Sequence, residues 1–167
     1  MKKLLILVLS SIIVLLVSCK KSADTVTHIN CDGLVTDTLG TGDNGRIYMQ
    51  NAFTPNGDGL NDISRPLTKN IASLSFTIYD GSNNIVFTTS TLLQGWATTV
   101  NPNTFTTYYY KIQATTNSGH HIGTCGELYK LSCLPAGVSL SSLFFEDQLL
   151  LNGTYSPTTL EHFSICP

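Results

Sequence analysis

Residues 52–62 (Ala-Phe-Thr-Pro-Asn-Gly-Asp-Gly-Leu-Asn-Asp) constrain the fold more than any other stretch of this 167-residue chain. Pro55 fixes its own φ angle, while Gly57 and Gly59 permit positive φ angles. The Asn and Asp side chains can close turns on the neighbouring backbone. Because the run follows an alternating apolar stretch at residues 46–53, it predicts a rigid loop of defined shape after a strand.

The same loop is a candidate cation site. Amide and carboxylate oxygens are the ligands that Ca²⁺ prefers. However, Leu60 and Leu67 occupy positions at which an EF-hand loop supplies ligands. We favour a turn whose side chains cap backbone N–H groups, and a calcium site remains the alternative. The candidate ligands are Asn56, Asp58, Asn61 and Asp62. No other cofactor is expected.

The N-terminus has the pattern of a bacterial lipoprotein signal. Two lysines precede an apolar run at residues 4–17, which is shorter than the roughly 20 residues that span a membrane. Residues 16–19 (Leu-Val-Ser-Cys) resemble a lipobox, which predicts cleavage before Cys19 and attachment of lipid to it. An ordinary secretory signal with a chance cysteine is the alternative.

This pattern sets the expected organisation of the chain. We expect a signal peptide at residues 1–18, a polar tether at 19–30 and a single domain at 31–167. Several acyl chains on one residue make a stable membrane anchor. Lys20 follows the cysteine where an Asp would favour the inner membrane, so we expect a lipid anchor in the outer membrane. The sequence leaves open whether the protein faces the periplasm or the cell surface.

The composition fits a secreted β protein. Removing Lys2 and Lys3 from nine basic residues leaves seven against eleven acidic ones, a formal net charge of −4. This balance argues against a nucleic-acid partner, for which a basic face is required. Thr, Ser, Asn and Gly are abundant, as in proteins built from short strands and turns.

Four cysteines remain after Cys19, an even number that predicts two disulfides in an oxidising compartment. They are Cys31, Cys125, Cys133 and Cys166, and the sequence does not determine their pairing. A bond from Cys31 would tie the N-terminal segment to the sheet, and one from Cys166 would hold the tail. Zinc binding by two of these cysteines with His120 and His121 is an alternative, but the spacing fits no finger or ribbon pattern.

Alternating apolar residues predict strands separated by turns. Leu74, Phe76 and Ile78 share one face of a strand that ends at Asp80, and a turn at residues 80–84 returns the chain through 85–89. Longer strands follow at 107–116 and 121–133, and the first of these places Tyr108, Tyr110, Ile112 and Ala114 on one face. This spacing predicts an all-β antiparallel sandwich. Residues 140–152, followed by Gly153, predict a short C-terminal helix or one more strand.

With these residues in place, the chain resembles the gliding-motility-associated C-terminal domain of Bacteroidetes, the type B sorting domain of the type IX secretion system. The run at residues 53–62 is its most specific part, and residues 76–80, 84–87, 95–96, 108–112 and 128–131 follow in the family's order. The likeness covers residues 47–133 and leaves 134–167 as a C-terminal extension. It implies an immunoglobulin-like β-sandwich that directs secretion across the outer membrane or attaches protein to the cell surface.

The chain departs from that family in several places. Residues 81–84 (Gly-Ser-Asn-Asn) replace the usual Arg-Trp-Gly turn, Ala97 follows Trp96 instead of Asp-Gly, and Thr107 replaces a glycine. The family's domain normally ends a large cargo protein, whereas here it makes up most of the chain. Two segments also resemble the Asp-Ser/Thr-apolar motif that Bacteroidetes O-glycosylate, with Thr25 and Thr38 as the acceptors.

No catalytic motif is evident, so we expect a non-catalytic protein. The resemblance implies a role in surface attachment, secretion or envelope assembly, with the membrane and the secretion or motility machinery as partners. A lipid-anchored adhesion module that binds surface glycans is the alternative. Trp96 and residues 108–110 could supply its aromatic platform, although such residues more often form the core of a sandwich.

Overall fold

The computed structural model describes residues 31–150 and 153–167. The predicted signal peptide (1–18), the tether (19–30) with the predicted lipidation site Cys19, and the glycosylation candidate Thr25 lie outside the described residues. Within the described part of the chain, no helix is both long enough and apolar enough to span a membrane.

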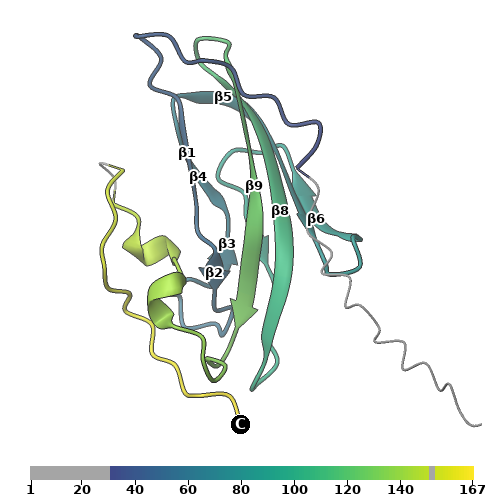
Figure 1. Ribbon diagram of the computed structural model, residues 1–167, viewed down its shortest axis with the longest axis vertical. Coiled ribbons are helices and arrows are strands. Elements are labelled where there is room, and N and C mark those ends of the chain that lie inside the picture. The colour runs from purple at the N-terminus through teal and green to yellow at the C-terminus, as the bar shows by residue number, and fades with distance from the viewer. Residues whose placement is uncertain (1–30, 151–152) are drawn as a thin grey trace, which may run out of the picture.

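A five-stranded sheet forms the body of the molecule (Figure 1). Its order is β2-β9-β8-β5-β6. The strands are β2 (Ala52–Phe53), β5 (Ile71–Tyr79), β6 (Ile85–Thr89), β8 (Phe105–Thr116) and β9 (His121–Leu131). β8 and β9 pair antiparallel from Phe105↔Leu131 to Thr115↔His121, and β5 pairs with both β8 and β6 in the same sense.

Two short ribbons form a second layer. β1 (Arg46–Met49) pairs antiparallel with β4 (Pro66–Lys69), and β3 (Ile63–Ser64) pairs with β7 (Trp96–Ala97). Figure 1 shows β1 and β4 running along one side of the large sheet. Ile47 and Met49 of β1 pack against the buried core of that sheet. The expected all-β sandwich is therefore confirmed.

The core follows the alternation in the sequence. Leu74, Phe76 and Ile78 of β5 are buried, and Ile112 and Ala114 of β8 meet them in the same cluster. Tyr108 and Tyr110 are partly buried against it. The side chains predicted to share one face thus do so, because side chains two residues apart on a strand point the same way.

Two details of the elements differ from the simplest form of these predictions. β2 pairs parallel with β9, in a sheet whose other pairings are antiparallel as predicted. The chain crosses between the layers after β1 and enters the large sheet in the direction of β9.

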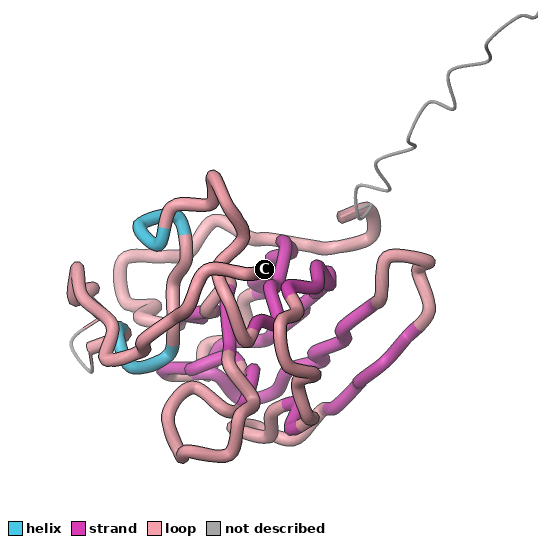
Figure 2. The backbone as a smooth tube through the Cα atoms, turned by 90° about the horizontal axis from the view of Figure 1, so that it is seen from below, coloured by secondary structure: helices cyan, strands magenta, loops and turns pink. Residues whose placement is uncertain are grey.

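Within the described residues 140–150, the segment predicted as a short helix or one more strand forms neither as one continuous element. Two single turns of 3₁₀-helix, η1 (Leu140–Ser142) and η2 (Glu146–Gln148), flank an extended segment. Leu143 and Phe145 are buried while Phe144 is 42% exposed, which is the period of two that favours extended backbone. Figure 2 shows both helical turns on one side of the strands.

The cysteines pair as Cys31–Cys125 and Cys133–Cys166, with Cα–Cα distances of 6.0 and 5.0 Å. The first bond ties the N-terminal arm (residues 31–45) to β9, and the second holds the C-terminal extension (residues 134–167). Both ties were expected from the sequence. Two cysteines of the zinc alternative are thereby used in disulfides.

Candidate functional site

The opening loop (residues 54–62) is held by its own side chains. Asp62 accepts hydrogen bonds from the backbone N–H groups of Gly57 and Gly59, each at 2.7 Å and on a different carboxylate oxygen. Both glycines have positive φ angles, of 85° and 88°. These conformations are accessible to glycine without steric cost, so the two glycines let the backbone turn around the Asp62 carboxylate.

Asn56 and Asp58 brace the tip of the same loop. Asn56 accepts from the backbone N–H of Asp58 at 3.0 Å, and Asp58 accepts from that of Leu60 at 2.8 Å. The hydrogen bond from Leu60, together with one from the Asn56 side chain, lowers the pKa of Asp58. These contacts support the turn interpretation, in which Asx side chains cap backbone N–H groups.

The geometry leaves calcium binding as the alternative to this turn. The carboxylate oxygens of Asp58 and Asp62 already accept hydrogen bonds, so an ion would compete with backbone N–H groups for them. Among the described residues, no group of three or more His, Cys, Asp or Glu side chains is arranged to hold a metal ion.

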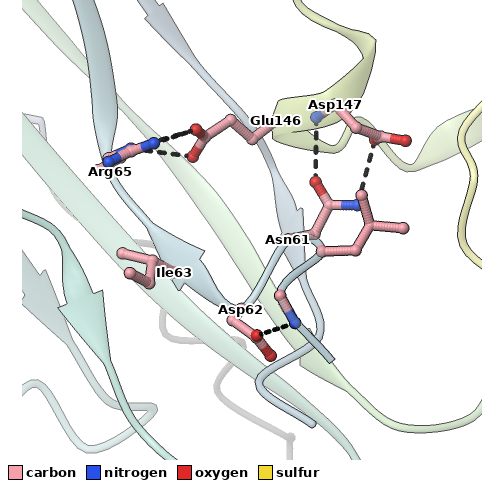
Figure 3. A pocket seen from close by; sticks show the side chains of 8 residues that line it. Asn61, Asp62, Ile63, Arg65, Glu146 and Asp147 are labelled. Carbon is pink, nitrogen blue, oxygen red and sulfur yellow. Dashed lines mark hydrogen bonds and ion pairs between the residues drawn. The ribbon is translucent and has the colours of Figure 1, made fainter. Parts of the chain in front are cut away.

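The extension contacts the end of the opening loop. Asn61 donates from its amide nitrogen to Asp147 at 3.1 Å and accepts from the backbone N–H of Asp147 at 3.0 Å (Figure 3). The same amide nitrogen also donates to Glu161 at 3.2 Å. The Thr54 hydroxyl also donates to Glu161. Sequence reasoning missed these contacts, because partners some 86 to 107 residues apart have no local signature.

An ion pair also contributes to this contact region between the opening loop and the extension, which we call the junction. Arg65 donates from Nε to both carboxylate oxygens of Glu146 at 3.1 Å and from Nη2 to one of them at 2.5 Å. This pairing raises the pKa of Arg65. A pocket of about 350 Å³ lies between the two segments, lined by residues 59–63, Arg65, Glu146 and Asp147 (Figure 3).

Glu161 is the most buried carboxylate of the junction, with 7% of its surface exposed. Burial raises its pKa, and the negative charges of Asp58 and Asp147 raise it further. The hydrogen bonds from Thr54 and Asn61 oppose this shift. The junction therefore holds Glu161 in an environment that favours its protonated form.

Apolar and main-chain contacts extend the junction beyond the loop. Phe145 is fully buried in a cluster with Ala52 of β2, Leu131 of β9 and Leu143. The carbonyl oxygen of Phe144 accepts from the backbone N–H groups of residues 51 and 52 at 3.0 and 3.1 Å. The extension thus covers the β2 edge of the large sheet.

Of the aromatic residues proposed as a glycan platform, Trp96, Tyr108 and Tyr110 are partly buried and pack against the core. Trp96 packs against Phe53 at 5.4 Å and Tyr108 at 4.8 Å between ring centroids. The Lys130 ammonium group lies over both the Trp96 and the Tyr108 rings. Their packing accounts for these residues without a ligand.

The remaining candidate residues lie in the N-terminal arm or contact it. His120 and His121 each contact a carboxylate there, Asp43 at 2.8 Å and Asp37 at 2.9 Å. The two histidines therefore join the start of β9 to the arm. Thr38, the glycosylation candidate within the described residues, is exposed.

Comparison with known proteins identifies one family. Residues 47–126 match the family model described as CHU_C Type IX secretion signal domain. The match begins in β1, includes the opening loop, ends within β9 and leaves out the extension. The resemblance predicted from the sequence is confirmed over this segment. No curated protein and no solved structure matches the chain.

Proposed function

Because residues 47–126 match a type IX secretion signal domain, we propose that the chain is a non-catalytic, lipid-anchored outer-membrane protein that works with the type IX secretion system. Its role would be surface attachment, secretion or envelope assembly. The single observation that carries this proposal is the family match, which includes the opening loop and most of the large sheet.

The lipid anchor is supported by the sequence at the N-terminus. A basic start, an apolar run and the lipobox-like residues 16–19 precede the tether. Lipid on Cys19 would hold the domain close to the membrane through about a dozen polar residues. Mass spectrometry of the purified protein tests this step. We expect a mature N-terminus at Cys19 with added acyl mass, and a Cys19→Ala variant should lack that mass.

Affinity capture from detergent-solubilised envelopes tests the partner. The tagged chain should retain components of the type IX system, while an unrelated outer-membrane lipoprotein carrying the same tag should not. Equal recovery of those components with both proteins would contradict the proposal. Binding of the purified domain to surface polysaccharides, without capture of secretion components, would favour the adhesion alternative instead.

A further inference from the structure

The extension lies outside the matched segment, yet it covers a defined strip of the matched domain. Along this strip, Asn51 and Ala52 donate their backbone N–H groups to the carbonyl oxygen of Phe144. The Asn51 side chain donates to the carbonyl oxygen of Ser142 at 3.0 Å and accepts from the N–H of Phe144 at 2.5 Å. An extended segment therefore lies against the β2 edge through main-chain contacts.

The same strip also forms an ion pair and hydrogen bonds with acidic side chains of the extension. Arg65 forms its forked ion pair with Glu146, and Asn61 exchanges two hydrogen bonds with Asp147. Phe145 packs in the buried apolar cluster with Ala52. Main-chain pairing at a sheet edge, with pockets for particular side chains, is the way strand-addition domains bind peptides.

The covering segment buries a carboxylate and is closed by a disulfide. Glu161 is buried against the strip, where burial and the nearby carboxylates disfavour its negative charge. The Cys133–Cys166 bond then holds the extension covalently at both of its ends. A closed loop of this kind keeps a segment in place even where its individual contacts are modest.

We propose that the strip formed by Asn51, Ala52, Thr54, Asn61 and Arg65 is a docking surface for an extended acidic segment of a partner protein. The chain's own extension occupies this surface until the partner displaces it. The positive charge of Arg65, which pairs with Glu146, and the Asn61 amide N–H, which donates to Asp147, specify the acidic partner. This inference deepens the proposed function and rests on it, because the strip lies on the domain that carries the type IX match.

Amide hydrogen exchange followed by NMR tests the proposal on the chain from Lys20 onward, which keeps every described element. In a Cys133→Ser/Cys166→Ser variant, the amides of Asn51 and Ala52 should exchange at least tenfold faster than in the parent. A peptide of residues 142–149 at millimolar concentration should restore their protection. The same peptide with lysine in place of Glu146 and Asp147 should not.

A second variant, Glu146→Gln with Asp147→Asn, weakens the contact while the disulfide stays intact, and its Asn51 and Ala52 amides should also exchange faster. The amide of Ile112 in β8 is the internal control for global unfolding. The proposal is overturned if the strip keeps its protection in both variants. It is also overturned if Ile112 loses protection together with the strip in both. Either result would make the extension an integral part of the core. Failure of the peptide to restore protection would overturn it too. None of these outcomes depends on capture of type IX components, so a failure of this proposal can be distinguished from a failure of the proposed function.

Discussion

Asp62 is the residue that sets the shape of the opening loop, since its two carboxylate oxygens hold the backbone N–H groups of Gly57 and Gly59. We expect Asp62→Ala to lower the free energy of unfolding by about 1–3 kcal/mol, because both donors lose their partner. Asp62→Asn keeps one acceptor oxygen and should cost less. Urea denaturation measures both, and an Asp62→Ala variant as stable as the parent would show that the loop does not depend on this carboxylate.

Calcium should not be needed to hold that loop, because its side-chain oxygens are already paired with backbone N–H groups. We expect the melting temperature to be the same in millimolar calcium and in excess chelator. A bound ion stabilises the native state by mass action, so a rise of several degrees with calcium would reveal a site. Magnesium at the same concentration controls for ionic strength.

Glu161 gives the extension a pH dependence. Its folded pKa is raised, so its contribution to stability falls as pH rises from the unfolded pKa, near 4.5, through the folded one. Glu161→Gln should therefore be more stable than the parent at neutral pH and lose that advantage below about pH 4, where the parent is protonated as well. Thermal melts of both proteins from pH 3 to 8 would measure the difference. An advantage that is the same at every pH would contradict the assigned cause.

At the scale of the elements, the sequence predicted those features that depend on neighbouring residues, such as strand faces and turns. The alternation of Leu74, Phe76 and Ile78 predicted the buried face of β5, and the Asp80 turn predicted its hairpin with β6. Asp80 accepts from the backbone N–H groups of Ser82 and Asn84, as turn residues of this type do.

Contacts between distant segments could not be predicted in this way. The parallel pairing of β2 with β9 joins residues 77 positions apart, and nothing near Ala52 indicates it. The hydrogen bond between Asn61 and Asp147 likewise joins residues that are far apart in the sequence. Within the described residues 140–150, the segment expected to form a helix or a strand forms neither continuously, because burial of Leu143 and Phe145 against the sheet outweighs the local preference.

The arm and β9 fit together at Gly123, where a Cβ atom would lie 2.8 Å from Cβ of Leu34 and 3.0 Å from the carbonyl oxygen of Val35. Gly123→Ala should therefore displace the arm and lower the free energy of unfolding by about 1–3 kcal/mol. Gly81→Ala is the matched control, since its Cβ would meet no atom within 4 Å. Equal stability of the two variants in urea would show that the arm contributes nothing at this site.

At the scale of the whole molecule, a sandwich that carries a secretion-signal match is fastened at both ends of the chain. The arm is joined to β9 by Cys31–Cys125, and the extension is closed over the β2 edge by Cys133–Cys166. The opening loop, which is the strongest marker of the family in the sequence, is therefore built into contacts with a segment outside the family match. This arrangement fits a domain that serves as the body of the protein as well as its link to a secretion pathway.

Protease shaving of intact cells tests that link most directly. The chain would be followed by immunoblot in a bacterium with a working type IX system and in the same strain with the system disabled, and an internal periplasmic protein would report on leakage. The account predicts that added protease removes the chain only where the type IX system works, because surface exposure depends on it. Equal removal in both strains, or equal protection in both, would contradict the account.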